Sequence, residues 1–411
     1  MNKPALLSMD EALEALLAAA VPVKETETVS TFDGHGRVLA QAVKSTLNVP
    51  PADNTSMDGY AVRSADTVAS GAVLKVAQRI PAGTVGTTLE AGTAARIFTG
   101  ALIPPGADAV VMQESTQAVG TGDEIRVTIN EAVKAGQWVR YAGEDIKQGS
   151  EVLSPGARLS PQACGLAASV GLANLTVARR LKVAVFFTGD ELAMPGEPLK
   201  PGAIYNSNRF MLRGLIEGIG CACTDFGIVR DTLDETRRVL REAAREHDLI
   251  ITTGGVSVGE EDHVRPAVEA EGEIKLWQIS MKPGKPLAYG KVRRPDSSAA
   301  NFIGLPGNPV SSFVTFLLFV RPFILKCQGV GDVTPKALQM RADFDWPKPD
   351  RRREFMRARM NAGGGLNLFP NQSSGVLTST VWGDGLVDTP SNHTIKRGDL
   401  VRFLPFSELL S

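Results

Sequence analysis

Apolar residues recur at helical spacing near the start of the chain. Leu13 and Leu17 are four residues apart, and positions three or four apart lie on the same side of a helix. Ser8 and Glu11 form the S-x-x-E pattern of a capping box, in which the two side chains satisfy free N–H groups at a helix start. We therefore predict a helix that begins after Ser8 and ends before Pro22.

Short strand-like runs dominate a second region, from about residue 48 to residue 141. The runs at 73–76, 109–112 and 125–129 are rich in apolar and β-branched residues, and clusters of Gly, Pro and Asp separate them. Such clusters between short apolar runs are typical of strands joined by turns. The region is therefore predicted to be a small β-rich domain.

Strands and helices alternate from residue 181 onward. The run at 183–187 is continuously apolar, as in a strand that is buried on both faces. Further strand-like runs lie at 224–229, 249–252, 274–278 and 302–304. Amphipathic segments separate these runs, and this alternation indicates a parallel α/β sheet. We predict one such domain over about 180–330.

The pattern becomes β-like again after Gly329. Short runs at 354–360, 366–369 and 400–404 lie between turns that contain Gly, Pro and Asn. This pattern predicts a small all-β domain of about 80 residues at the C-terminal end of the chain.

The composition is that of an ordinary globular protein. The chain has 411 residues, of which 43% are apolar and 22% charged, close to the average for soluble domains. The formal net charge of −1 argues against nucleic-acid binding. The longest strongly apolar run, at 313–320, is shorter than the roughly 20 residues of a membrane span, and no secretory signal is visible. We expect a cytoplasmic protein that binds neither nucleic acid nor a membrane.

Cysteine and histidine offer little chemistry. The four cysteines and four histidines are widely scattered along the chain. We therefore expect neither a disulfide framework nor a histidine-rich zinc site. Cys221 and Cys223 could chelate or cross-link, but a simple turn between a helix and a strand explains them better. The chemistry is therefore expected from carboxylates, lysines, arginines and backbone amides.

Polar loops follow four of the predicted α/β strands. Glu191 follows the first strand, Asp231 the second, a glycine-rich loop at 253–259 the third, and the LPGNPVSS loop at 305–312 the fourth. Parallel strands end at a common sheet edge, and ligands of α/β folds bind there. We therefore expect the four loops to meet in one site.

The TGGVSVG loop at 253–259 suits a phosphate or another oxyanion. Its glycines let backbone N–H groups approach an anion, and the start of a following helix adds attraction. The loop lacks the Gly-Lys-Ser/Thr ending of a P-loop. A tight turn without a ligand is the alternative, and the three companion loops favour the anion.

Three acids in these loops, Glu191, Asp231 and Asp262, are candidate ligands of a hard cation. Mg²⁺ binds one or two carboxylates together with phosphate oxygens of a substrate. Taken alone, each acid is better explained as a helix cap or a solvated residue. Asp231 directly precedes the predicted helix start at Thr232, where capping is a real alternative.

Basic residues gather in two later segments. Lys282 and Lys285 lie in a Pro/Gly-stiffened loop, and their ammonium groups suit a multiply charged anion, although a solvated turn explains them equally well. The RRREFMR run at 351–357 could face a nucleic acid, but the neutral chain and the lack of interleaved exposed aromatics argue against that. One arginine facing an anion, or a solvated edge strand, is favoured.

Seven motifs together resemble one family. They are NTSMDGYAVR at 54–63, RIFTGA at 96–101, GEDI at 143–146, TGDEL at 188–192, TGGVSVG at 253–259, KPGKP at 282–286 and GLPGNPVS at 304–311. In this order, and over nearly the whole chain, they closely resemble the molybdopterin molybdenumtransferases, which are related to the E-domain of gephyrin. The glycine-rich loop alone would mark only the shared molybdopterin-binding fold, whereas the MDGYAVR block, together with the full four-domain length, is much more specific.

The resemblance implies a multidomain fold that combines α/β and β domains. A discontinuous N-terminal domain comprises residues 1–45 and 146–180, and a β-rich domain is inserted at 46–145. A central molybdopterin-binding α/β domain follows at 181–330, and a small C-terminal β-barrel at 331–411. The family forms homodimers with the active cleft at the subunit interface.

The resemblance also implies an activity. Family members take adenylylated molybdopterin and molybdate, release AMP and give molybdenum cofactor, with Mg²⁺ assisting. The expected protein partners are a second copy of the chain, the molybdopterin adenylyltransferase and cofactor-accepting proteins. Two alternatives stay open, namely adenylyl transfer to molybdopterin on the same fold and a non-catalytic scaffold like some E-domains. The preference between molybdate and tungstate, and the order of AMP cleavage and metal insertion, also stay open.

Position-by-position matching assigns roles along the chain. The catalytic matches are Asp58, Thr99, Asp145, Glu191, Asp231 and Asp262, and the last three are also the implied metal ligands. The substrate-binding matches are Gly254, Gly255, Ser257, Gly259, Lys282, Lys285, Pro286, Pro306, Pro309, Ser311, Arg357 and Ser374. Two positions depart from the family pattern, because Gln278 stands where some relatives have a lysine and Asn206 where many have an aspartate.

Overall fold

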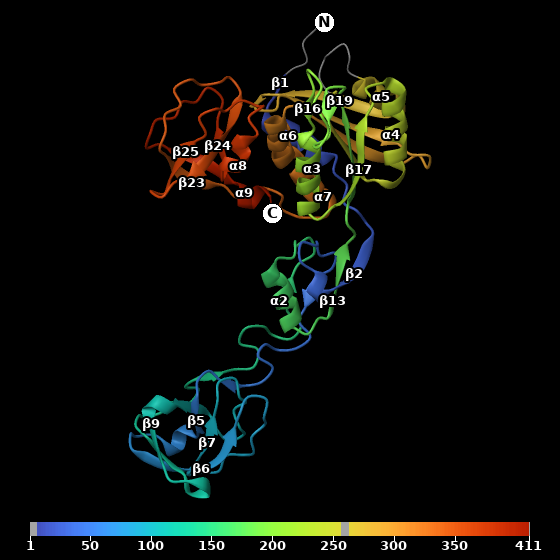
Figure 1. Ribbon diagram of the computed structural model, residues 1–411. Helices are drawn as coiled ribbons and strands as arrows, with labels where there is room; N and C mark the ends of the chain where they lie inside the picture. Colours follow the sequence, from blue (N-terminus) through green and yellow to red (C-terminus); the bar gives the residue numbers. More distant parts are fainter. Residues whose placement is uncertain (1–5, 256–262, 411) are drawn as a thin grey trace.

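The molecule is elongated (Figure 1). The α/β domain and the C-terminal β domain lie side by side at one end, a small domain with α2 (Pro161–Ser169) lies in the middle, and the β-rich domain lies at the other end. This computed structural model describes residues 6–255 and 263–410. The arrangement confirms the predicted fold class. The domain boundaries drawn at 45, 145, 180 and 330 remain predictions.

A seven-stranded sheet forms the centre of the α/β domain, in the order β1-β19-β21-β22-β18-β14-β17. The strands are β1 (Leu6–Leu7), β14 (Lys182–Thr188), β17 (Ala222–Val229), β18 (Leu249–Thr253), β19 (Gly272–Ile279), β21 (Pro286–Arg293) and β22 (Ala299–Leu305). β21 runs antiparallel to both of its neighbours, β19 and β22. The sheet is therefore mixed rather than wholly parallel, because the chain returns through β21 by hairpin connections instead of helices.

Helices cover both faces of this sheet. The helices are α3 (Ser207–Gly218) and α6 (Pro309–Thr315) on one face and α4 (Leu233–Glu246) and α5 (Val264–Glu271) on the other. Val183 and Val185 of β14 join the first cluster of buried residues, whereas Ala184 and Phe186 join the second. Alternate strand residues point to opposite faces, so β14 is apolar at successive positions because both faces are covered.

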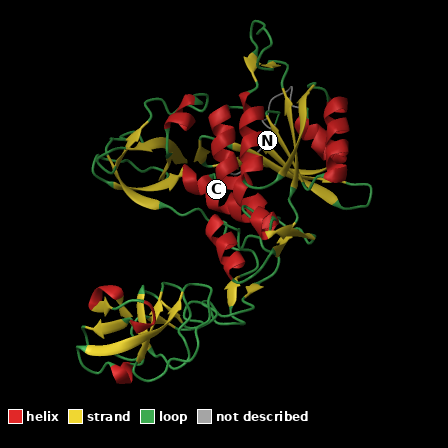
Figure 2. Cartoon of the chain, turned by 60° about the horizontal axis from the view of Figure 1, so that its bottom comes forward, coloured by secondary structure: helices red, strands yellow, loops and turns green. Residues whose placement is uncertain are grey.

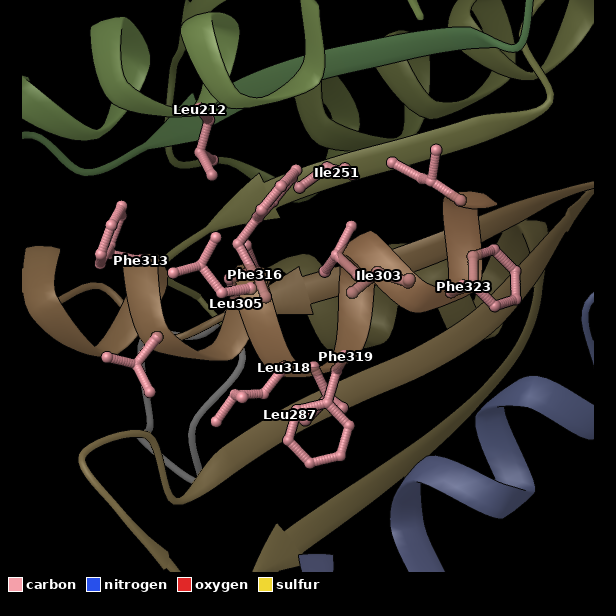
Figure 3. Close-up of a cluster of buried hydrophobic side chains, with 14 of the residues drawn as sticks. Leu212, Ile251, Leu287, Ile303, Leu305, Phe313, Phe316, Leu318, Phe319 and Phe323 are labelled. Atoms are coloured by element: carbon pink, nitrogen blue, oxygen red, sulfur yellow. The ribbon is translucent and has the colours of Figure 1, made fainter. Parts of the chain in front are cut away.

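One helical segment, 309–327, runs through the core. It consists of α6, the π-helical η5 (Phe316–Val320) and α7 (Arg321–Cys327). With 19 residues and a mean hydropathy of 1.7 it is long and apolar enough to cross a membrane, but 94% of it is buried inside the protein. Figure 3 shows Phe319 of this segment beside Leu287 of β21. The segment is therefore explained as a core helix, and it is longer than the apolar run read from the sequence.

The N-terminal segment packs into the α/β core. The first helix is confirmed as α1 (Met9–Ala18), with the capping box in place, since Ser8 Oγ accepts from Glu11 N over 3.2 Å and Glu11 Oε2 from Ser8 N over 2.8 Å. The helix ends four residues before Pro22. Leu16 is buried in the same cluster as the strands of the sheet, and β1 pairs with β19. Strand β1 and helix α1 thus extend the α/β domain at its edge.

The middle and β-rich domains each have a core of their own, and Figure 2 shows them clearly apart. The middle domain pairs β2 (Thr26–Ser30) with β13 (Asn174–Ala178) and β3 (Val43–Lys44) with β12 (Glu151–Leu153). The β-rich domain holds β5 (Gly59–Val62), β6 (Ala72–Ile80), β7 (Thr93–Ile97), β8 (Ala109–Met112), β9 (Thr116–Val119) and β10 (Arg126–Ile129) in one six-stranded sheet. The short pair of β4 (Asn54–Thr55) and β11 (Val139–Arg140) also belongs to this part of the chain.

The C-terminal domain is a closed barrel. Its strands are β23 (Leu338–Ala342), β24 (Arg353–Met360), β25 (Gly365–Leu368), β26 (Gly385–Thr389) and β27 (Leu400–Pro405), and the pairing of β24 with β26 closes the ring. A short strand of the α/β domain, β20 (Met281–Lys282), pairs with β24. This pairing fixes the barrel directly beside the lysine-bearing loop.

Candidate active site

The four predicted loops leave one edge of the sheet. β22, β18, β14 and β17 are neighbours in that order, and each adjacent pair is parallel. Gly254 N donates to Leu305 O over 3.1 Å, and a Cβ added to Gly307 would lie 3.7 Å from the Cα of Gly254. The start of the glycine-rich loop therefore touches the 305–312 loop, so two of the four predicted loops meet at the strand ends.

Two hollows open beside this contact. The first, here called the interdomain cleft, lies between the α/β domain and the barrel and has a volume of about 550 Å³. The second, here called the strand-end hollow, lies at the ends of β14 and β18 beside the start of α3 and measures about 590 Å³. Gly254, Gly307 and Asn308 line both hollows. These three residues form a wall that the two hollows share, and a ligand with two parts could place one part on each side of it.

The α/β side of the interdomain cleft presents hydrogen-bond donors. Lys285 is exposed and forms no ion pair with any described residue. Ser311 is buried near the start of α6, and its hydroxyl has no hydrogen-bond partner among the described residues. Gly284 adopts a φ of +106°, and a Cβ there would lie 2.4 Å from Thr315 Oγ1. The lysine loop can therefore pack closely on the helix only with glycine at this position.

The barrel side of the cleft contributes two acids, Asp350 and Glu354, and one cation, Arg352. Lys282 Nζ lies 2.9 Å from Glu354 Oε1 and 3.4 Å from Asp350 Oδ2. Arg352 lines the cleft and donates to Asp350 through Nε and NH2, each over 3.0 Å. Val310 N donates to Ser374 O over 3.0 Å, which ties the helix start to the barrel loop that carries Ser374.

Arg357 lies behind the cleft rather than in its wall. Its side chain is only 1% exposed, and its guanidinium donates to Ser379 Oγ, Phe355 O and Ser373 O over 3.0 to 3.3 Å. Burial lowers its pKa to about 10. No carboxylate among the described residues pairs with it. The family resemblance assigned Arg357 to the oxyanion. The arginine that lines the cleft is Arg352. The two residues are five positions apart, and residues an odd number of positions apart along an extended chain point to opposite sides.

The strand-end hollow is lined by polar and apolar residues from several strands, from α3 and from the 305–312 loop. Glu191 and Tyr205 are exposed in its wall. Asn208 Nδ2 donates to Gly307 O over 2.8 Å, which joins α3 to the 305–312 loop. Asn206 Oδ1 caps α3 by accepting from Arg209 N over 3.2 Å, a role that needs no carboxylate.

The remaining substrate-binding predictions divide between the two hollows or fall outside the described residues. Gly254, Gly255, Pro286, Pro306 and Ser374 line the interdomain cleft, and Pro309 lines the strand-end hollow. Ser257, Gly259 and Asp262 lie outside the described residues. Asp231 is half-buried after β17 and is not among the described residues that line either hollow. Within the described ranges no group of three His, Cys, Asp or Glu residues could hold a metal.

Three predicted catalytic residues lie far from the hollows of their own chain. Asp58 and Thr99 belong to the β-rich domain, where Asp58 Oδ1 accepts from Thr99 N and from Thr99 Oγ1, each over 2.7 Å. These two hydrogen bonds hold the pKa of Asp58 below its usual value. Asp145 is exposed at the junction between the middle and β-rich domains. Figure 1 shows the β-rich domain at the opposite end of the molecule from the α/β domain and the barrel.

A third hollow, here called the lateral hollow, lies between α1 and the barrel. Its volume is about 630 Å³. Arg353 donates to Asp388 Oδ1 and Oδ2 over 2.6 and 2.7 Å and to Asp10 Oδ1 over 3.1 Å, and Arg402 Nε lies 3.2 Å from Asp388 Oδ2. The sequence analysis assigned no function to these residues.

Family comparisons match almost the whole chain. The MoeA N-terminal region (domain I and II) matches residues 7–171, a probable molybdopterin binding domain matches 184–326, and the MoeA C-terminal region (domain IV) matches 339–406. Together with the fold and the cleft, these matches define a class of multidomain proteins built around a molybdopterin-binding α/β domain.

Individual relatives narrow this class. The molybdopterin molybdenumtransferase of Haemophilus influenzae is 42% identical over 325 residues, which cover 79% of this chain and 78% of the relative. That of Nostoc is 36% identical over 382 residues, covering 90% and 86%. A crystal structure of molybdopterin biosynthesis moeA protein from Pyrococcus horikoshii superposes with a TM-score of 0.83 at 28% identity, covering 98% of this chain and all of that one. The chain belongs to the molybdopterin molybdenumtransferase family and is a transferase of molybdenum cofactor biosynthesis.

Proposed function

We propose that the chain transfers molybdenum from molybdate to adenylylated molybdopterin, with release of AMP. The interdomain cleft carries this proposal, because Lys285 and Ser311 present donors there that no described residue uses. Buried or fixed polar groups are normally paired within a protein. Donors left free in one cleft indicate that a ligand supplies the acceptors, and molybdate supplies four oxygens and two negative charges.

Molybdate would bind among Lys282, Lys285, Ser311, Arg352 and Ser374, which line the cleft. The start of the helical segment 309–327 adds the positive end of its dipole. Arg357 adds a further positive charge from behind the wall, and this charge is weakly screened because the side chain is buried.

The pterin and phosphate parts of the second substrate would lie across the shared wall. Backbone N–H groups of Gly254 and Gly255 suit a phosphate, and the strand-end hollow has room for a ring system beside Tyr205. This arrangement would place a molybdate oxygen close to the phosphoanhydride. Catalysis would then come from position and fixed charge, without a covalent enzyme intermediate, and preorganised charge is commonly the largest contribution to such reactions.

A magnesium ion is part of the proposal. Glu191 and Asp231 follow the adjacent strands β14 and β17, and carboxylates are the donors that Mg²⁺ prefers. Bound there with Asp262, the ion would offset negative charge on the phosphoanhydride. The Asp262→Asn variant tests this assignment, because it should fold normally and lose Mg²⁺-dependent AMP release; an unchanged release rate would reject the metal role.

We also propose a homodimer in which the β-rich domain completes the partner's site. The β-rich domain, which carries Asp58 and Thr99, lies at the opposite end of the molecule from the α/β domain and the barrel (Figure 1), so within one chain these residues would have no part in the cleft. Mixing Asp58→Asn chains with Lys285→Ala chains tests this. If the sites are shared, neither variant alone is active, but the mixed dimer regains up to about half of one wild-type dimer's activity, since one of its two sites is intact. Two inactive parents whose mixture stays inactive would contradict the shared site.

The proposed reaction is separated from its alternatives by one assay. Purified protein is given molybdate and adenylylated molybdopterin, or ATP and free molybdopterin. Cofactor and AMP are measured in the first mixture, and adenylylated molybdopterin and pyrophosphate in the second. Molybdate-dependent product from the first mixture supports the proposal. Product only from the second would indicate an adenylyltransferase, and product from neither would indicate a scaffold. The neutral net charge and the burial of the segment 309–327 support a site of action in the cytoplasm.

A further inference from the structure

Two carboxylates lie beside the cations of the interdomain cleft. Asp350 lies three residues before the start of β24, and Glu354 is the second residue of that strand. The ammonium of Lys282 contacts both, at 3.4 and 2.9 Å. Negative groups close to an anion site weaken the binding of the anion, so acids in this position oppose the function proposed for the cleft. Their placement therefore requires an explanation beyond anion attraction.

Both acids are held in place by the surrounding structure. Glu354 is buried, and its second oxygen accepts from Trp346 Nε1 over 2.9 Å. The pairing of β20 with β24 puts Lys282 opposite Glu354 in register. Hydrogen bonds from Arg352, together with the positive charge of the nearby Lys282, hold the pKa of Asp350 well below its usual value. The two carboxylates are thus fixed beside the cations of the cleft.

The two ion pairs hold the Lys282 ammonium between the acids and the cleft. It lies 2.9 Å from Glu354 Oε1 and 3.4 Å from Asp350 Oδ2, and an ammonium has three N–H donors. The side chain lines the cleft and is 39% exposed, so it remains accessible to a ligand there. Around the cleft, the three lining cations Lys282, Lys285 and Arg352 and the buried Arg357 behind the wall exceed the two carboxylates by two positive charges.

We propose that Asp350 and Glu354 are specificity-determining residues of the oxyanion site. They orient Lys282 and keep the positive charge of the cleft low, so that a tetrahedral dianion binds reversibly and can be handed on to the acceptor. This inference rests on the oxyanion site proposed above. It differs from a structural ion pair in one respect, because removal of either acid must change anion affinity in proportion to the charge of the anion.

The test compares two tetrahedral oxyanions of different charge. Calorimetry gives the dissociation constants of molybdate, a dianion, and perrhenate, a monoanion, for wild type, Glu354→Gln and Asp350→Asn. Each variant should bind molybdate more tightly, by on the order of tenfold, and perrhenate by only about threefold, since the Coulomb energy is proportional to the ligand charge. The gain should shrink as ionic strength rises.

Asp388→Asn is the matched control. Asp388 is a buried carboxylate of the same barrel, but it lines the lateral hollow, so its removal should leave both dissociation constants unchanged. If Asp350→Asn binds molybdate no more tightly than wild type, or gains equally for both anions, the inference is wrong while the oxyanion site stands. If Glu354→Gln does not fold, Asp350→Asn alone decides the question. If wild type binds no molybdate, or Lys285→Ala binds it as well as wild type does, the proposed function itself fails.

Discussion

The interdomain cleft and the lateral hollow lie between the same two domains, yet their charged groups are partnered differently. Lys282 and Arg352 line the cleft, whereas the neighbouring Arg353 lines the lateral hollow. In the lateral hollow Arg353 and Arg402 share the buried carboxylate of Asp388. In the cleft Lys285 has no such partner among the described residues.

The comparison shows that size does not identify the site. The lateral hollow is the larger of the two, at about 630 against 550 Å³. Its principal cations are neutralised within the protein, so binding an anion there would require breaking ion pairs to a buried acid. The cleft keeps donors, Lys285 and Ser311, that no described residue engages, so an anion can bind there without breaking an ion pair of the protein. The oxyanion site is therefore identified by cations and donors that lack a partner within the described residues, and not by the volume of the hollow.

The largest expected effect comes from the free donor of the cleft. Lys285→Ala should lower kcat/KM for molybdate on the order of 10²- to 10³-fold, because a fixed positive donor at a charged reacting group is lost. Steady-state assays of cofactor formation measure this. The matched control is Arg402→Ala in the lateral hollow, which should change kcat/KM by less than about twofold. Equal losses in the two variants would remove the distinction between the hollows.

The next largest effect is on stability, and it belongs to the lateral hollow. Asp388→Asn leaves Arg353 and Arg402 without their shared carboxylate, and breaking such a buried pair costs about 3 kcal/mol. Urea unfolding, followed by tryptophan fluorescence, should show this loss in the free energy of unfolding. Activity per folded molecule should stay at the wild-type value. A large loss of activity in the folded variant would show that the lateral hollow contributes to the reaction.

Arg357 offers a smaller effect that separates binding from stability. Arg357→Met removes a buried cation that has only neutral acceptors, so the loss of hydrogen bonds is offset by the relief of desolvation. We expect molybdate binding to weaken about tenfold, while the free energy of unfolding changes by less than about 1 kcal/mol. Calorimetry and urea unfolding test the two parts. A strongly destabilised variant with unchanged molybdate affinity would make Arg357 a structural residue.

The sequence predicts this site where local pattern and general topology suffice. The apolar runs that became β14, β18 and β22 could be identified because they are continuously apolar and alternate with amphipathic segments. Parallel pairing then required Glu191, Gly254 and the 305–312 loop to share an edge. The capping box of α1 is equally local, because its hydrogen bonds join residues three apart.

The rest of the site depends on contacts between distant segments. Nothing in the MKPGKP loop shows that Lys282 will pair with β24, and the RRREFMR run does not show which arginine enters the cleft. The register Met281↔Arg353 and Lys282↔Glu354 decides both, and it is a tertiary contact over about 70 residues of chain. Asp58 was named only through the family resemblance, since no pattern near it indicates a distant cleft.

The smallest expected effect concerns the exposed edge of the lateral hollow. Asp10 is 84% exposed and lies 3.1 Å from Arg353 NH1, while Asp388 already holds the same guanidinium from its buried side. Asp10→Ala should therefore lower the free energy of unfolding by less than about 0.5 kcal/mol, as for other exposed pairs. In an Asp388→Asn background Asp10 becomes the principal carboxylate partner of Arg353, and the same substitution should then cost about 1 kcal/mol. Equal costs in the two backgrounds would mean that the two acids act independently, and the shared-carboxylate account of the lateral hollow would be wrong.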